Sequence, residues 1–192
     1  AAMQEEQCTS HRTLQVTTLL QGIMTTSFEE DKKRGKIGER IFKEDFLDFL
    51  GITYEDVTGC QQFQIIDTDY LTKIGTYEVK ANYKDNKMLV FEDWSNVNKS
   101  RGWIYKTKAD LLVFVSKKTR TMIFLPFTDR FKKHYGYIKQ NTKQLFNTSQ
   151  KNGRMWKSAY RKVPFDMLAG YISVYKVKPD VDQSVSRPNF FQ

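Results

Sequence analysis

The sequence predicts an α/β protein with a mixed central sheet flanked by helices, built as a single domain with an N-terminal arm. Hydrophobic residues make up 40% and aromatic residues 14% of the 192 residues, enough for a packed core, and this length favours one domain. Segments of helical and strand periodicity follow in the order helix, three strands as a meander, crossover, further strands and helix. We assign residues 1–34 to the arm, 35–178 to the core and 179–192 to a polar C-terminal tail.

The first half of the core contains a helix and three strands. Apolar residues recur at steps of three and four over Lys36–Leu50, which predicts a helix that ends at Gly51. The helical apolar face comprises Ile37, Ile41, Phe42, Phe46, Phe49 and Leu50. Runs rich in β-branched and aromatic residues predict strands at Phe63–Leu71, Thr76–Asn82 and Met88–Trp94.

The second half begins with a helix or ordered loop centred on Asn98–Lys106. The segments ADLLVFV and MIFLPF predict two buried strands, and Thr128–Phe146 predicts a helix with Thr128 as its N-cap. Lys151–Lys162 is basic and is interpreted as a loop. The segment VPFDMLAGYISVYKV then predicts a short helical turn and a final strand.

Composition excludes several classes of protein. There is no run of 18 apolar residues, so no membrane association is expected, and the polar start AAMQEEQ does not resemble a secretory signal. Ala1 and Ala2 precede Met3 and are interpreted as a cloning remnant. The two cysteines and two histidines lack zinc-site spacing, which favours a reducing cytoplasm. The net charge of +9 favours a polyanionic partner, for which nucleic acid is the leading candidate.

Charged residues interrupt the apolar stretch FQIIDTDYLTKIGTYEVKANY. The triplet acid-any-Lys occurs about as often as chance allows, but only Glu78-Val79-Lys80 lies inside a predicted strand. Residues two apart in a strand share a face, so Glu78 and Lys80 point the same way. A hairpin with an even-numbered loop puts Asp69 opposite Glu78 and Asp67 opposite Lys80, whereas a one-residue change of loop length separates them.

Two interpretations of this hairpin remain open. Two neighbouring carboxylates repel each other unless a cation lies between them, and Mg²⁺ binds such oxygen ligands together with substrate phosphate. A lysine beside the ion can orient the attacking water in phosphodiester hydrolysis. Alternatively, the charges lie on the solvated face of an amphipathic hairpin and form cross-strand salt bridges.

This arrangement resembles the PD-(D/E)xK nucleases, the superfamily of restriction endonucleases, Holliday junction resolvases and phage recombination nucleases. The resemblance covers Gly35 to Phe127: an acidic residue in the first helix, an Asp on one strand and Glu-x-Lys on the next. The segment FEDWSNVNKSRGWIYKTKADLLVFV also resembles phage and plasmid members. The resemblance implies a restriction-endonuclease-like fold, with activity on DNA that is branched or cut in a restriction-like manner, and a homodimer that cuts two strands.

The resemblance also implies the site residues. Asp69 and Glu78 would bind Mg²⁺, for which Mn²⁺ can substitute, and Lys80 would lie beside the attacking water. Glu39 in the first helix would be an auxiliary ligand, with Glu44 as the alternative, and Asp67 competes with Asp69 for its role. No Pro precedes Asp69, a departure from the family pattern.

Basic residues after the third strand and in the late basic segment are candidates for contacts to the DNA backbone. They are Lys99, Arg101, Lys106 and Lys108, and Lys151, Arg154, Lys157, Arg161 and Lys162. Trp94 and Trp103 are expected in the core. Glu92 and Asp93 on the third strand are within reach of the metal site, but a surface position is favoured for both.

Two competing functions remain: a basic DNA-binding protein without catalysis, and a phage-encoded protein that binds a host factor in the host cytoplasm. The arm, or Phe190 and Phe191 in the tail, are candidates for docking such a protein partner.

Overall fold

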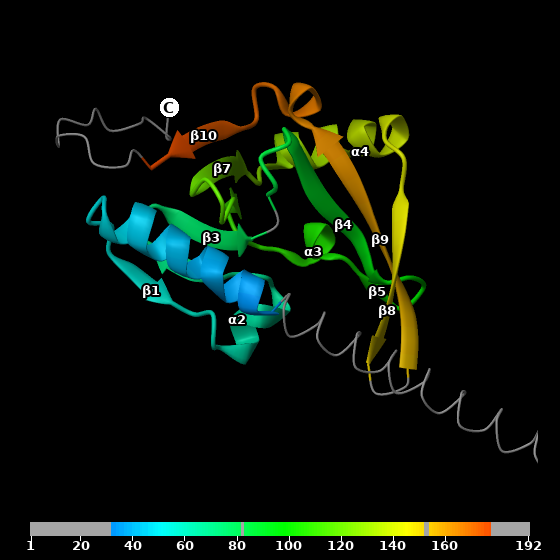
Figure 1. Ribbon diagram of the computed structural model, residues 1–192, viewed down its shortest axis with the longest axis horizontal. Helices are drawn as coiled ribbons and strands as arrows, with labels where there is room; N and C mark the ends of the chain where they lie inside the picture. The colour runs from blue at the N-terminus through cyan, green and yellow to red at the C-terminus, as the bar shows by residue number, and fades with distance from the viewer. Residues whose placement is uncertain (1–31, 82, 152–153, 178–192) are drawn as a thin grey trace, which may run out of the picture.

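The computed structural model describes residues 32–177 apart from residue 82 and residues 152–153, and this part of the chain is a mixed α/β structure with two sheets (Figure 1). The larger sheet has six strands in the order β1-β2-β3-β6-β7-β10. Its strands are β1 (Tyr54–Asp56), β2 (Tyr70–Thr72), β3 (Gly75–Lys80), β6 (Leu111–Val115), β7 (Thr121–Pro126) and β10 (Ser173–Lys176). Strands β3 and β6 run parallel and the other neighbouring pairs are antiparallel, so the sheet is mixed as predicted.

The second sheet has four antiparallel strands in the order β5-β4-β9-β8. They are β4 (Met88–Asn96), β5 (Ser100–Arg101), β8 (Leu145–Lys151) and β9 (Arg154–Pro164). The chain passes from β3 through β4, β5 and the short helix α3 (Trp103–Lys106) before it returns as β6. This long crossover allows β3 and β6 to be parallel.

Two longer helices lie on opposite faces of the six-stranded sheet (Figure 1). The first is described from residue 32, is α-helical to residue 42 and continues as the π-helical segment η1 (Lys43–Asp48). The other is α4 (Asp129–Asn141), where the Thr128 hydroxyl accepts a hydrogen bond from the Phe131 amide and confirms the predicted N-cap. Two short helices complete the fold: α2 (Gln61–Ile65) and the 3₁₀ segment η2 (Phe165–Leu168).

The central strands separate two apolar clusters. One cluster lies between the first helix and the six-stranded sheet. It contains Ile41 and Phe42 of the helix and, on β6, the residues that face the helix, such as Val113. The other lies between the opposite face of β6 and elements α3, α4 and β4, and contains Phe114, Phe91 and other aromatic side chains. All five residues of β6 are buried, because both faces of this strand are covered.

The first helix departs from the predicted periodicity near its end. Phe49 was placed on the apolar face, but its side chain is 55% exposed, whereas Leu47 is fully buried. A π-helix has more residues per turn than an α-helix, so η1 rotates the following side chains away from the α-helical phase. Gly51 has a φ of +64° where the helix ends, which agrees with its predicted role as the stop.

Three other expectations are wrong. The predicted strand Phe63–Leu71 is mostly the helix α2 and a turn, and only its last two residues enter β2. The three-strand meander is not formed, because β4 pairs with β9 in the second sheet and β3 pairs with β6. The predicted basic loop Lys151–Lys162 is largely strand β9, whose alternate residues Ala159, Arg161 and Val163 are buried. The alternation of buried and exposed residues in β9 was not recognised in the sequence, because basic residues occur among the exposed positions.

The boundaries of the arm and tail are seen only in part. Residues 32–34, assigned to the arm, belong to the first helix, whereas residues 1–31 and the tail with Phe190 and Phe191 lie outside the described residues. In the described ranges, no helix combines the length and apolar character that crossing a bilayer requires.

Candidate functional site

The hairpin of β2 and β3 has the even-numbered loop on which the position of Asp69 beside Glu78 depends. Tyr70 pairs with Tyr77, Leu71 with Thr76 and Thr72 with Gly75, around a two-residue loop. Asp69 directly precedes β2, and its amide donates to the Tyr77 carbonyl at 2.8 Å, one residue off the register of the strands, so the regular pairing ends at Tyr70. The two-residue loop is the even-numbered case that the sequence left open, but the strand pairing does not extend to Asp67 and Asp69.

The chain before β2 turns sharply and fixes both aspartates. Asp67 has a φ of +46°, a conformation that non-glycine residues seldom adopt, and its carbonyl accepts a hydrogen bond from the Thr107 hydroxyl at 2.9 Å. The Asp69 carboxylate accepts from the Val79 amide at 2.8 Å, which holds it next to Glu78. Asp69 is therefore tied to β3 directly, whereas Asp67 is tied to the segment after α3.

Glu78 and Lys80 form an ion pair on the face of β3 that looks toward the second sheet. The Glu78 side chain is 6% exposed, and its Oε1 contacts the Lys80 ammonium. Its other oxygen, Oε2, is buried and has no hydrogen-bond partner, and the same is true of Oδ2 of Asp67. Buried carboxylate oxygens without a partner are costly, and a bound cation is one arrangement that compensates for them.

The electrostatics show that the carboxylates lie close together. Burial, together with the charges of Asp69 and Asp67, raises the pKa of Glu78 to about 7, although Lys80 opposes this shift. Burial and the charge of Glu39 raise the pKa of Asp69 to about 6. The pKa of Glu39 is raised by burial and by the charge of Glu78. The charge of Glu39 on the first helix therefore acts on Asp69, and that of Glu78 acts on Glu39.

The Lys80 ammonium is held between the carboxylates and an indole ring. Its Nζ lies 5.0 Å from the ring centroid of Trp103, at the start of α3. Burial lowers the pKa of Lys80, but the charges of Glu78 and Asp67 outweigh burial, so the pKa is raised and the side chain stays protonated. Trp103 is buried, as expected, and serves as one wall of the site.

Glu92 on β4 joins this site, although the sequence placed it at the surface. Burial raises the pKa of its carboxyl group, which also interacts with the charges of Lys80 and Asp67. The Trp103 amide lies 3.4 Å from its Oε2. Gly102 makes this approach of α3 to β4 feasible, because a Cβ there would overlap the Glu92 carbonyl. We call Glu39, Asp67, Asp69, Glu78 and Glu92, with Lys80, the carboxylate cluster.

The structure brings together the residues that sequence reasoning selected and separates the alternative. Glu44 pairs with Arg120 at 3.9 Å, outside the carboxylate cluster, so Glu39 is the helical carboxylate that faces Glu78. Among the described residues, no group of three or more His, Cys, Asp or Glu side chains is arranged to hold a metal ion. The cluster is thus a set of interacting carboxylates, and the positive charge beside them is the Lys80 ammonium.

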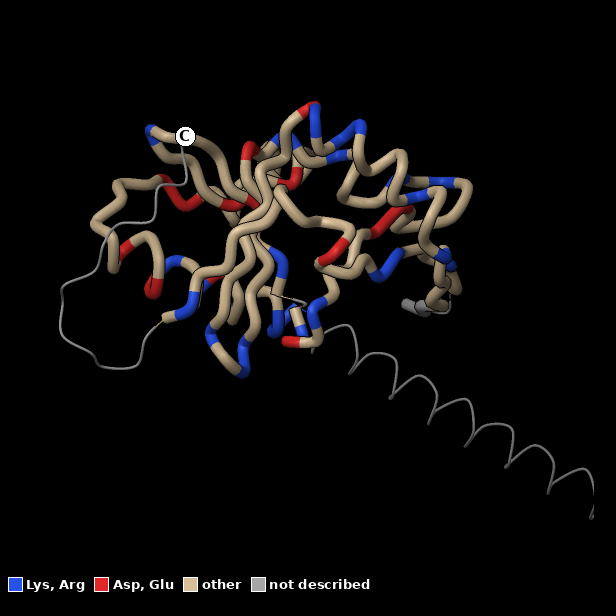
Figure 2. Tube along the Cα trace, turned by 90° about the horizontal axis from the view of Figure 1, so that it is seen from above, with Lys and Arg blue, Asp and Glu red and all other residues tan. Residues whose placement is uncertain are grey.

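Several basic candidates for DNA contacts are exposed. They are Lys99, Arg101, Lys106, Lys108, Lys157 and Lys162, whereas the side chains of Lys151 and Arg154 lie outside the described residues. The Arg101 guanidinium stacks 4.0 Å from the ring centroid of Trp94, and Lys157 lies 4.4 Å from that of Phe146. Figure 2 shows Lys and Arg positions in both halves of the molecule, many of them at turns.

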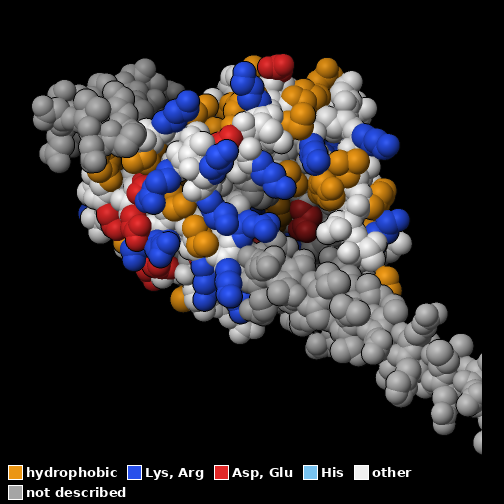
Figure 3. All heavy atoms as spheres, in the orientation of Figure 1, with side chains coloured by type: hydrophobic (Ala, Val, Ile, Leu, Met, Phe, Trp, Pro, Cys, Tyr) orange, Lys and Arg blue, Asp and Glu red, His pale blue; other side chains and the backbone are white. Residues whose placement is uncertain are grey.

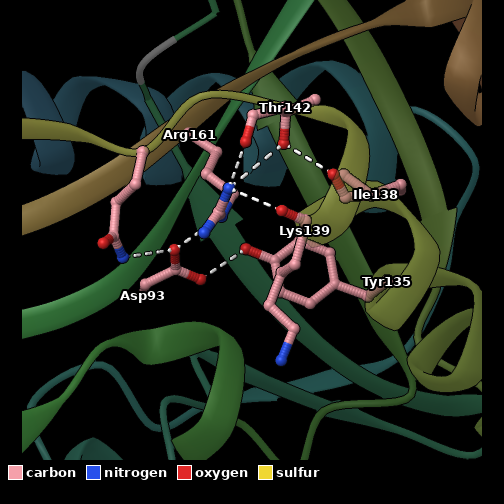
Figure 4. Close-up of polar contacts among 7 residues, drawn as sticks. Asp93, Tyr135, Ile138, Lys139, Thr142 and Arg161 are labelled. Atoms are coloured by element: carbon pink, nitrogen blue, oxygen red, sulfur yellow. Dashed lines mark hydrogen bonds and ion pairs between the residues drawn. The ribbon is translucent and has the colours of Figure 1, made fainter.

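Arg161 is not available for DNA, contrary to the prediction. Its side chain is buried and donates to Asp93 at 2.7 Å and to the carbonyl of Lys139 at 3.0 Å (Figure 4). Asp93, predicted at the surface, is 2% exposed and also accepts from Tyr135 at 2.8 Å and Gln144 at 2.9 Å. Burial and the charge of Asp93 raise the pKa of Tyr135, so its hydroxyl keeps its proton. This buried network joins β4, β9 and α4.

A comparison with protein-family models, curated proteins and solved structures finds no match to this chain.

Proposed function

We propose that this protein is a metal-dependent endonuclease of the PD-(D/E)xK type, with a restriction-endonuclease-like core, that hydrolyses phosphodiester bonds in DNA. The observation that carries the proposal is the convergence of Asp69, Glu78 and Lys80 in a buried hairpin, with unpartnered oxygens on Glu78 and Asp67. Buried acids with raised pKa values beside a specific charge partner are typical of functional sites.

Two carboxylates of the chain would suffice for a divalent cation that is also bound by substrate phosphate and water, although no group of three acidic side chains in the described residues is arranged to hold one. Hard oxygen donors are the ligands that Mg²⁺ prefers, and Mn²⁺ accepts the same set. Asp69 and Glu78 would hold the ion, with Asp67 or Glu39 as a further ligand, and the ion would satisfy the unpartnered oxygens of Glu78 and Asp67. When bound, such an ion polarises the phosphoryl oxygen and lowers the pKa of a bound water.

Lys80 has a separate role in this proposal. Its ammonium stays protonated and is oriented by Glu78 on one side and Trp103 on the other. A fixed cation at this position stabilises the negative charge that develops on the phosphate and orients the attacking water. With Glu78 engaged as a metal ligand, the Lys80 ammonium would face the substrate.

DNA is the substrate that the charge favours. The chain carries a net charge of +9, and exposed basic side chains lie on several elements around the cluster. Figure 3 shows an acidic group recessed in a hollow, with Lys and Arg side chains on the surrounding surface. The resemblance suggests branched or restriction-like substrates and a homodimer that cuts both strands.

The test is cleavage of linear, branched and single-stranded DNA with Mg²⁺ or Mn²⁺. We expect Glu78→Gln and Lys80→Met to lower the rate at least about 100-fold, the range seen when one electrostatic contact to a transition state is removed. Glu55→Gln and Lys73→Met are matched controls, because both residues are exposed and lie in the same sheet region. The proposal is wrong if the wild-type protein cuts none of these substrates, or if the two site variants cut like the controls.

The second candidate is a DNA-binding protein without catalysis. The ion pair between Glu78 and Lys80 favours it, since this contact compensates part of the buried charge without any metal. This candidate predicts that the protein binds DNA equally in Mg²⁺ and in EDTA, and that Mg²⁺ leaves the free energy of unfolding unchanged.

A further inference from the structure

A second feature of the molecule is a pocket in which half of the lining residues are basic. Its volume is about 340 Å³, and it lies where the ends of β3 and β6 meet the first helix. Four of its lining residues are cationic, and we call this set the basic pocket: Arg34, Lys84, Lys117 and Lys118. None of them was among the residues that the sequence nominated for contacts with DNA.

The one acidic residue in the lining, Asp85, is already hydrogen-bonded to neighbouring hydroxyl groups. The Asp85 carboxylate accepts hydrogen bonds from the Thr119 hydroxyl, at 2.7 Å, and from the Ser116 hydroxyl. It therefore holds the turn between β6 and β7, and its single charge offsets one of the four cations, which leaves the pocket with a net positive charge.

The lysines of the basic pocket keep their charge available. Within the described part of the chain, Lys84, Lys117 and Lys118 form no salt bridge and are exposed. Arg120, on the same turn as Lys117 and Lys118, is by contrast paired with Asp45. Clustered cations repel each other, so an anion bound among them gains from several charges at once.

The basic pocket adjoins the carboxylate cluster. Ala81 lines the pocket and directly follows Lys80, the last residue of β3. It is three residue steps from Glu78 along the chain, which is about 10 Å at about 3.3 Å per residue. Arg34 precedes Glu39 by five residues of helix, about 7.5 Å. Gly38 packs against Ala81 so closely that a Cβ would overlap it, so the helix and β3 meet at this point.

We propose that the basic pocket binds backbone phosphates of duplex DNA a few nucleotides from the phosphodiester bond that the carboxylate cluster hydrolyses. A span of about 10 Å corresponds to roughly three nucleotides of axial rise, at about 3.4 Å per nucleotide of one strand. The pocket contacts phosphates, not base edges, so it positions the duplex without reading its sequence. This inference rests on the proposed function for the position of the cut, but it concerns a separate set of residues.

The experiment measures DNA binding apart from cleavage. A fluorescently labelled duplex is titrated with the full chain in EDTA, by anisotropy, at several salt concentrations from 50 to 200 mM. The variant is Lys117→Ala/Lys118→Ala. The control is Lys73→Ala/Lys133→Ala, which removes the same charge from exposed lysines outside the pocket lining.

The expected result is a change in salt dependence. Each phosphate contact contributes about 0.9 to the slope of log K against log salt, so the pocket variant should reduce the slope by about 1.8. The control should keep most of the wild-type slope. Equal slopes in the two variants, or no binding of the duplex by the wild-type protein in EDTA, would overturn the inference.

The outcomes separate this inference from the proposed function. A protein that shows the expected slopes but cuts no DNA with Mg²⁺ retains the phosphate site and loses the nuclease assignment. A protein that cuts DNA, but whose pocket variant keeps the wild-type slope, retains the nuclease assignment and loses the phosphate site.

Discussion

The buried pair of Asp93 and Arg161 offers the sharpest test of how this fold is held together (Figure 4). The perturbation is Arg161→Ala, which removes the guanidinium and leaves Asp93, at 2% exposure, without its charged partner. Tyr135 and Gln144 still donate to Asp93, but neither carries a charge. The carbonyls of Lys139 and Thr142 also lose their donor.

The magnitude follows from these lost contacts. Breaking a buried ion pair by removing one partner costs about 3–5 kcal/mol of folding free energy, since the remaining charge is buried and uncompensated. For a chain of this size, each kcal/mol shifts the Tm by about 2–4 °C, so the variant should melt roughly 10 °C lower. Lys162→Ala is the matched control, because Lys162 is the next residue of β9 and is exposed. It should change stability by less than about 0.5 kcal/mol.

The assay is thermal and urea unfolding followed by circular dichroism. A double variant, Asp93→Asn/Arg161→Met, should be more stable than Arg161→Ala, since it buries no unpaired charge. If Arg161→Ala melts like Lys162→Ala but weakens DNA binding, Arg161 contacts DNA as the sequence suggested and the buried pair is wrong.

The remaining predictions concern the carboxylate cluster and two helices. Without metal, the folded state holds a proton on Glu78 up to about pH 7, whereas the unfolded chain releases it near 4.5. The free energy of unfolding in EDTA should therefore decrease by about 3 kcal/mol as the pH rises through this window, and Glu78→Gln should flatten the decrease; urea titrations at each pH measure it. Thr128→Ala should cost about 1 kcal/mol by loss of the N-cap, with Thr128→Ser restoring it in the same assay. Gly38→Ala should lower the Tm through overlap with Ala81, whereas Gly136→Ala, with open space around it in α4, should raise it; the reverse order would refute the packing of the first helix on β3.

Local patterns in the sequence were sufficient for the hairpin that carries the candidate site. The turn between β2 and β3 and the alternation of side chains are properties of neighbouring residues, so the side-by-side placement of Glu78 and Lys80 on β3 follows from the chain itself, whereas the position of Asp69 depended on a loop length that the sequence left open. The N-cap at Thr128 and the helix stop at Gly51 were predictable for the same reason.

Predictions from the periodicity of apolar residues were wrong where the helix geometry changed or where a residue was paired with a distant strand. The π-helical turn in η1 shifted the phase, so Phe49 turned outward and Leu47 inward. Strand β9 looked like a loop because basic residues, such as Lys157 and Lys162, occur among its exposed positions. Arg161 occupies an inward position where Asp93 and the carbonyls of Lys139 and Thr142 accept its hydrogen bonds. Single-sequence patterns do not reveal a charge that is paired across the fold.

Which residues share a site was decided by the tertiary structure. Glu92 reaches the carboxylate cluster because Gly102 lets α3 pack closely against β4 of the second sheet. The basic pocket forms because β3 and β6 end beside the first helix. These contacts join residues far apart in the chain. The conformational entropy lost when the intervening loops close is offset only by the packing of the core as a whole. The sequence therefore nominated Asp69, Glu78 and Lys80 as candidates, whereas packing placed Glu92 beside them, formed the basic pocket and buried Arg161.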